Sequence, residues 1–127
     1  MNSLINGPDW YPKIPKITPP AKACDSHAHL YGPFSRFPID PENGNGPDTT
    51  YEQYRNMLDI LGVERAILVQ ARDYGTVDHV TIDAIERANG NIKGIAAMPR
   101  EALEKNIDFL LSKDFCGIRL SSFSPGA

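Results

Sequence analysis

The segment "RAILVQ", residues 65–70, decides the fold because it is a short apolar run between a helical pattern that stops at a glycine and a polar loop. A run of this length without polar alternation is typical of a parallel strand covered on both faces. The chain on either side repeats the combination of strand and amphipathic helix. The sequence therefore predicts an α/β fold built on a parallel sheet.

The expected strands cover residues 23–30, 65–70, 92–98 and 115–120, and the expected helices cover residues 51–61, 78–89 and 101–112. Thr50 and Gln53 form a capping box before the first helix, and Gly62 suits the left-handed position that ends it. The order βαβαβαβ fits either an open doubly wound sheet or part of a (β/α)8 barrel. No G-x-G-x-x-G follows the first strand, so no dinucleotide is expected.

Residues 1–22 contain five prolines and are expected to form an extended arm, in which Trp10 and Tyr11 could anchor to the domain over residues 23–127. The net charge of −3 offers no basic stripe for nucleic acid or a membrane surface. The sequence also contains no secretory signal pattern and no apolar run long enough to span a bilayer. Cys24 and Cys116 lie in separate strands, which favours free thiols and a cytoplasmic location.

The end of the first strand carries the residues best suited to chemistry, in "CDSHAHLYGP", residues 24–33. Alternation along a strand is expected to place Asp25, His27 and His29 on one face. Two imidazoles in this arrangement can reach one divalent ion, zinc above all, which would activate water and polarise a carbonyl group. Catalytic zinc usually has three protein ligands, so further ligands are needed. The alternative is a hydrogen-bonded histidine pair packed against loops.

The stretches "ACDSHAHLYGPFSRFPI", "ERAILVQARDYGTVDHVTIDAI" and "GIRL" resemble the amidohydrolase superfamily, in particular its amidohydrolase-2 branch. That branch includes 2-pyrone-4,6-dicarboxylate lactonases, related sugar-acid lactone enzymes and metal-dependent decarboxylases. The resemblance covers roughly residues 20–123. It implies a TIM-type barrel and a hydrolase that opens a carboxylated lactone; the alternatives are a decarboxylase of the same fold and a non-catalytic, truncated half-barrel.

The resemblance also implies roles for individual residues. His27 and His29 would bind a divalent metal or, as in the pyrone lactonases, contact the substrate without a required metal. Arg36, Tyr74 and Arg119 match positions around a carboxylated substrate, and an arginine can clamp a carboxylate through two parallel hydrogen bonds. For Tyr74 and Arg119 a surface role is the competing interpretation.

The family's later histidines and its late aspartate follow strands beyond the fourth. A barrel of this kind takes about 250 residues, so this chain of 127 residues is expected to form the N-terminal half of a (β/α)8 barrel. The last strand would then present an unpaired edge. Such edges could pair in a homo-oligomer, and whether the chain alone is an enzyme stays open.

Overall fold

The structure is a computed structural model that describes residues 7–39, 46–74 and 77–120. Its strands are β1 (Cys24–Ala28), β2 (Arg65–Val69), β3 (Ile92–Ala96) and β4 (Phe115–Ile118). Its helices are α1 (Tyr51–Leu61), α2 (His79–Arg87) and α3 (Arg100–Ser112), with a short 3-10 helix, η2 (Arg72–Tyr74), after β2. The predicted order βαβαβαβ is confirmed, and each strand ends one or two residues earlier than expected.

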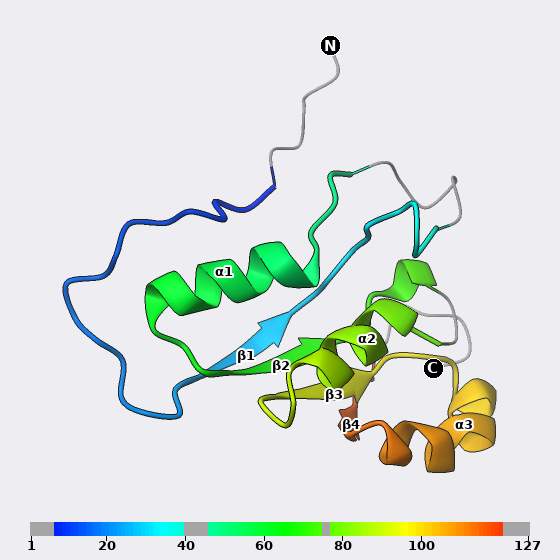
Figure 1. The fold of residues 1–127 in the computed structure, drawn as a ribbon. Coiled ribbons are helices and arrows are strands. Elements are labelled where there is room, and N and C mark those ends of the chain that lie inside the picture. The colour runs from blue at the N-terminus through cyan, green and yellow to red at the C-terminus, as the bar shows by residue number, and fades with distance from the viewer. Residues whose placement is uncertain (1–6, 40–45, 75–76, 121–127) are drawn as a thin grey trace.

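The sheet decides between the two architectures that the sequence left open. Its strand order is β1-β2-β3-β4, and all three pairings are parallel. Right-handed crossovers between strands in sequential order place every connecting helix on the same face of the sheet. A doubly wound sheet instead reverses its order and carries helices on both faces. The strands and helices, which can be traced from β1 to β4 in Figure 1, therefore have the arrangement of a barrel segment.

The predicted signals at the ends of α1 are confirmed. The Thr50 side chain accepts a hydrogen bond from the backbone N–H of Gln53, and the Gln53 side chain accepts one from the N–H of Thr50. Gly62 ends the helix with a φ of 74°, in the left-handed region that glycine adopts without a steric penalty. In the described ranges, none of the helices combines the length and apolar character needed to cross a bilayer.

The main core lies between the sheet and the helices. Helices and strands both contribute buried side chains to this core, among them Leu58, Leu68, Ile85, Ile92 and Phe115. The helix α3 buries only part of its apolar residues. Leu110 is buried, but Ile107 is 48% exposed and Leu111 is 63% exposed, which leaves part of the apolar surface of α3 in solvent.

The described part of the N-terminal arm, residues 7–22, runs along the outside of the domain (Figure 1). Trp10 packs partly buried against the core, as expected. Its carbonyl oxygen also accepts a hydrogen bond of 3.1 Å from the Asn56 side chain of α1. The same expectation is wrong for Tyr11, which is 78% exposed, and Ile14 and Ile17 further along the arm are also exposed.

Candidate functional site

His27 and His29 meet at the carboxyl end of β1. Their Nε2 atoms lie 3.3 Å apart, and the two rings stand edge to face with an interplanar angle of 82°. His27 is exposed and His29 is half-buried. In barrels built from parallel strands, the carboxyl ends of the strands are where ligands bind. The expected histidine pair therefore exists, at the edge of the sheet where such a site is expected.

The partner of His29 fixes how the pair can share protons. Its Nδ1 lies 2.8 Å from the carbonyl oxygen of Val69, the last residue of β2. A carbonyl oxygen only accepts, so Nδ1 carries the hydrogen and Nε2 of neutral His29 keeps its lone pair. In the 3.3 Å contact, Nε2 of His27 is then the donor. The neutral pair thus combines one donor, His27, with one acceptor, His29.

Asp25 does not join the histidine pair as the alternation predicted. Its carboxylate accepts a hydrogen bond of 2.8 Å from the Tyr54 hydroxyl of α1 and one of 3.2 Å from the N–H of His27. The pairing of β1 with β2 shifts register between Asp25 and Ala28. Such a β-bulge inserts a residue and breaks the alternation of side chains, so Asp25 binds the helix layer instead.

Two tyrosines hold the loop that follows His29. The Tyr31 hydroxyl donates to Asp73 of η2 at 2.8 Å. The Tyr74 hydroxyl accepts from the N–H of Gly32 at 2.7 Å and donates to the carbonyl oxygen of Phe37 at 3.2 Å. Burial, aided by Asp73, raises the pKa of Tyr31 to about 12, and burial also raises the pKa of Tyr74. Tyr74 therefore ties the loop after β1 to the loop after β2.

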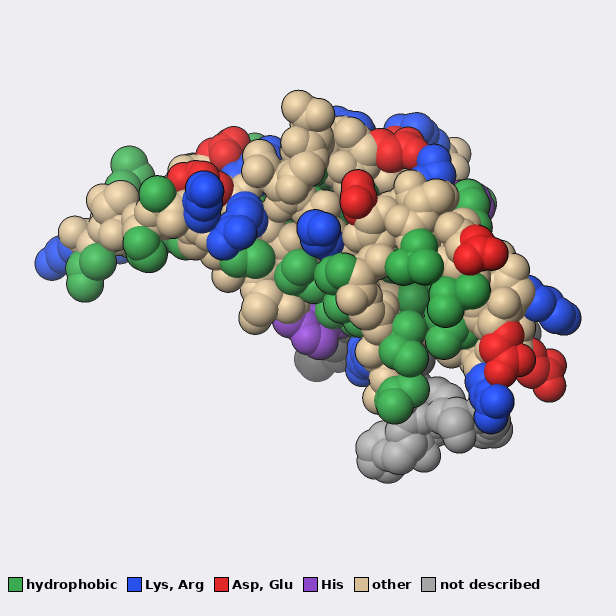
Figure 2. Space-filling model, turned by 90° about the horizontal axis from the view of Figure 1, so that it is seen from below, with side chains coloured by type: hydrophobic (Ala, Val, Ile, Leu, Met, Phe, Trp, Pro, Cys, Tyr) green, Lys and Arg blue, Asp and Glu red, His purple; other side chains and the backbone are tan. Residues whose placement is uncertain are grey.

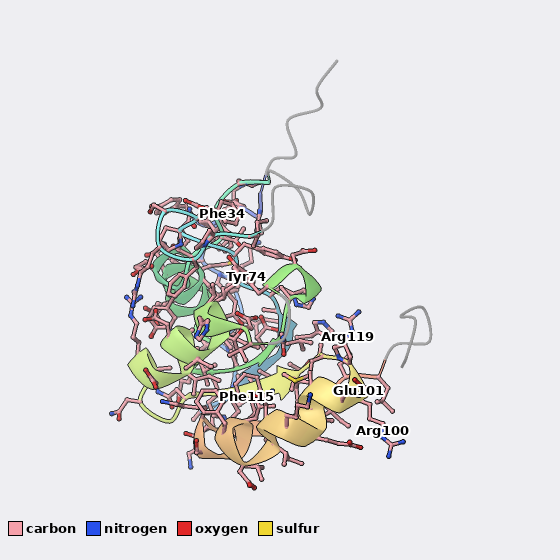
Figure 3. All side chains as sticks on the ribbon, turned by 90° about the vertical axis from the view of Figure 1, so that its right-hand side faces the viewer. Phe34, Tyr74, Arg100, Glu101, Phe115 and Arg119 are labelled. Atoms are coloured by element: carbon pink, nitrogen blue, oxygen red, sulfur yellow. The ribbon has the colours of Figure 1, made fainter. Side chains whose placement is uncertain are left out.

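The structure places the two predicted arginines apart. Arg36 forms a 2.9 Å ion pair with Asp83 of α2, in the helix layer. Arg119 follows β4, where its N–H donates to the carbonyl oxygen of Ala96 at 2.7 Å and its side chain is exposed. Figure 3 shows Arg119 well separated from Tyr74. Among residues 7–39, 46–74 and 77–120, no hydrogen bond or ion pair joins Arg36, Tyr74 or Arg119 to either imidazole.

A buried polar group that the sequence did not single out supports the end of β2. The Asp78 carboxylate caps α2 by accepting from the N–H and the hydroxyl of Thr81, and it also accepts from the N–H of Ala71 at 3.2 Å. Burial raises the pKa of Asp78. The side chain of Gln70, the residue before Ala71, is also buried and accepts from the N–H of Ala97. Gln70 directly follows β2 and Asp78 directly precedes α2. Their position in the connection between strand and helix was the available signal, because such loops meet at one edge of the sheet.

The donors present do not complete the expected metal site. Nε2 of His27 and Nε2 of His29 approach each other closely enough to share one ion. Within the part of the chain that the structure describes, however, no group of three or more His, Cys, Asp or Glu side chains is arranged to hold a metal. Catalytic zinc usually takes three protein ligands. The described residues thus supply two imidazole nitrogens, which is fewer than the three protein ligands of a catalytic zinc site.

Comparison with curated proteins confirms the resemblance expected from the sequence. The chain is 32% identical over 116 residues to a 2-pyrone-4,6-dicarboxylate hydrolase of Comamonas testosteroni, an alignment covering 89% of this chain and 38% of that protein. It is 28% identical over 120 residues to a 4-sulfomuconolactone hydrolase of Hydrogenophaga intermedia, covering 94% and 39%. The chain is thus homologous to lactone hydrolases and spans about two fifths of their length. No protein-family model matches it.

Solved structures share the fold. A protein of Agrobacterium tumefaciens in its apo form aligns with a TM-score of 0.70 and 22% identity, over 94% of this chain and 42% of that one. A probable 2-pyrone-4,6-dicarboxylic acid hydrolase of Acinetobacter baumannii with citric acid bound aligns with a TM-score of 0.67 and 22% identity, over 78% and 37%. The four-stranded parallel βαβαβαβ arrangement therefore matches part of each of these larger chains.

Proposed function

We propose that His27 and His29 form the proton-transferring part of a hydrolytic site that opens a carboxylated lactone. The observation that carries the proposal is the Nε2–Nε2 approach of 3.3 Å at the carboxyl end of β1, combined with the hydrogen bond from His29 to Val69. The relatives, whose names describe hydrolysis of 2-pyrone-4,6-dicarboxylate and 4-sulfomuconolactone, support this class of substrate.

The donor–acceptor character of the pair suits ester hydrolysis. When substrate binds, Nε2–H of His27 exchanges Nε2 of His29 for the lactone carbonyl oxygen, where negative charge develops as water adds. Nε2 of His29 accepts the proton that the attacking water loses. The ring C–O bond then breaks, and the leaving oxygen takes a proton from His29, which yields a hydroxy or enol acid. Val69 holds the His29 ring throughout, because its carbonyl oxygen binds the opposite nitrogen.

For the carboxylates of the substrate, Arg119 is the better-placed partner. Its side chain is exposed just beyond β4, at the carboxyl edge of the sheet. Arg36 is paired with Asp83 in the helix layer and would have to exchange that partner for the substrate. Tyr74 acts in this proposal by positioning the loop after His29, because its hydroxyl is already engaged by the backbone of that loop.

Binding of a divalent metal by Nε2 of His27 and Nε2 of His29 remains a prediction. A bound zinc ion would polarise the lactone carbonyl, which is the task assigned above to His27. Zinc titration into the chain, followed by calorimetry, measures whether the pair binds it. Replacing His27 by alanine should abolish any such binding, and His79→Ala, at an exposed position on α2, is the matched control.

The activity is tested in a chimera, because the chain spans about two fifths of its curated relatives. The aligned part of the Comamonas hydrolase is replaced by this chain, and acid release from 2-pyrone-4,6-dicarboxylate is followed by pH-stat titration. We expect activity that falls by about 100-fold or more in His27→Ala and in His29→Ala, the scale of one lost oxyanion donor or one lost acid–base group. His79→Ala should retain it.

Three results would contradict the proposal. Full activity in either site variant would show that the pair does not act. A chimera that is folded, as judged by circular dichroism, but releases no acid would contradict the assignment of a lactone substrate. Release of carbon dioxide in place of acid would move the assignment to the decarboxylase alternative.

A further inference from the structure

The His27 imidazole is held by fewer contacts than the imidazole beside it. The ring of His29 is fixed at one nitrogen by the carbonyl oxygen of Val69 and meets His27 at the other. In the ranges that the structure describes, the His27 ring has a single hydrogen-bond partner, which is His29. The 3.3 Å contact between the two Nε2 atoms therefore depends on where the backbone of His27 places its ring.

That backbone lies in the bulge of β1. Between the paired residues on either side, Ser26 and His27 of β1 stand opposite the single residue Ile67 of β2. The N–H of His27 donates to the Asp25 carboxylate at 3.2 Å. A bulge re-aims the side chains it carries, and a short acidic side chain can bind the backbone where the ladder is disrupted. The Asp25 carboxylate therefore helps to hold the shape of the bulge.

Tyr54 of α1 fixes the Asp25 carboxylate from the other side. Its hydroxyl donates to Oδ2 at 2.8 Å, while Oδ1 accepts from the N–H of His27. The Tyr54 ring is 2% exposed and belongs to the core. Burial and the bond to Asp25 raise the pKa of Tyr54, so its hydroxyl keeps the proton and stays a donor. In Figure 1 α1 lies beside β1, and this hydroxyl joins the helix to the strand.

We propose that Tyr54 is a positioning residue of the histidine pair. Through the Asp25 carboxylate it holds the bulged backbone of β1, and so keeps the His27 ring in contact with its neighbour. The two rings are then held from different layers, His29 from strand β2 and His27 from helix α1. Figure 2 shows histidine side chains at the surface of the molecule, whereas Tyr54 is buried. The effect on turnover rests on the proposed function, whereas the placement of His27 does not.

The first test measures the placement of His27 without any reaction. Hydrogen exchange is followed residue by residue in the chimera described above, with and without Tyr54→Phe, which keeps the buried ring and removes only the donor to Asp25. We expect faster exchange at the N–H of His27 and unchanged exchange in β2, because a local contact is lost while the fold is kept.

Two further variants complete this test. Asp25→Ala, at a half-buried position, should also speed exchange at His27 without touching the core. Tyr51→Phe is the matched control on the same helix and should leave exchange at His27 unchanged, because the Tyr51 ring packs under Arg87. Unchanged exchange at His27 in Tyr54→Phe or in Asp25→Ala would overturn the proposal, and so would an equal acceleration across β2.

An asparagine at position 25 separates a positioning role of Asp25 from an acid–base role. Both oxygens of the carboxylate are engaged, one by His27 and one by Tyr54. An asparagine side chain can keep both contacts, since its oxygen accepts from the N–H of His27 and its amide group donates to the Tyr54 oxygen. Asp25→Asn should therefore retain most of the turnover of the chimera that Asp25→Ala loses. An equal loss in the two variants would overturn the positioning role.

The closing experiment measures turnover in the chimera with Tyr54→Phe and His27→Ala, singly and combined. Tyr54→Phe alone should lower kcat by between about 10-fold and 100-fold with little change in KM. In the His27→Ala background it should lower kcat no further, because no ring is left to position. The same loss in both backgrounds would overturn the proposal. Full activity of His27→Ala would contradict the proposed function instead, and the exchange at His27 would then decide the positioning role on its own.

Discussion

Nδ1 of His29 lies 2.8 Å from the carbonyl oxygen of Val69, so a side chain beyond β1 is bound to the last residue of β2. The contact joins residues 40 positions apart in the chain. Because that oxygen can only accept, it sets the proton position on His29 and, through the 3.3 Å contact, on His27. The acid–base character of the pair is thus decided by a main-chain atom of the neighbouring strand.

The tautomers can be measured directly. Long-range 1H–15N correlation spectra of the histidine rings, recorded above the titration range of imidazole, should show hydrogen on Nδ1 of His29 and on Nε2 of His27. His79 is exposed at the start of α2 and provides a reference for a ring in solvent. Hydrogen on Nε2 of His29 would contradict the assignment.

Replacing Tyr74 by phenylalanine should loosen the loop after β1. The change leaves the N–H of Gly32 without its acceptor and the carbonyl oxygen of Phe37 without that donor. We expect a loss of about 1 kcal/mol in the free energy of unfolding, together with faster hydrogen exchange at Gly32. Tyr51→Phe is the control, because in the described part of the chain the Tyr51 ring packs under Arg87 and its hydroxyl forms no hydrogen bond. Equal exchange at Gly32 in both variants would show that the Tyr74 hydroxyl does not hold the loop.

Replacing Asp78 by alanine should be among the most destabilising single changes outside the apolar core. It removes the cap of α2 and leaves the N–H of Ala71 buried without an acceptor. The expected cost is about 2 to 4 kcal/mol in urea unfolding. Asp78→Asn keeps an acceptor oxygen at the same place and should cost clearly less. Wild-type stability in Asp78→Ala would show that the cap contributes nothing measurable.

The raised pKa of Tyr31 predicts a loss of stability in alkali. Because the folded pKa is about 12 and the unfolded value about 10, the folded protein binds the phenolic proton more tightly between these values. The stabilisation is complete below about pH 10 and declines as the pH rises toward 12. Tyr31→Phe should therefore flatten this alkaline decline and remove tyrosinate absorbance at the upper end of the titration. An unchanged pH profile would argue against the bond to Asp73.

Replacing Gly94 by alanine should strain the packing between β3 and β4. A Cβ atom at this position would lie 2.8 Å from two ring atoms of the buried Phe115. The expected loss in the free energy of unfolding is about 1 to 3 kcal/mol, as for other overpacked cores. Gly46→Ala is the matched control, because a Cβ atom there meets nothing within 4 Å. Similar thermal midpoints for both variants would contradict the close approach.

Much of the backbone could be predicted from the sequence because its determinants are local. The apolar run in residues 65–70 and the helical spacing around it specified the order of strands and helices. The capping box of Thr50 with Gln53 and the left-handed Gly62 formed as expected, since each depends only on residues a few positions away. The H-x-H pattern likewise identified the histidine pair, because both residues belong to one short segment.

Tertiary structure alone decided how these helices and strands are arranged and which side chains pair. Only the sheet order placed all helices on one face, because crossover handedness acts on whole strands. The Asp25 carboxylate, at the bulge in β1, binds the Tyr54 hydroxyl. The Val69 carbonyl oxygen fixes the position of the proton on the His29 ring. Both partners are distant in sequence. The sequence by itself thus determined which residues form strands, helices and the histidine pair. The fold determined their partners, because hydrogen bonds between separate segments depend on how strands and loops meet in space.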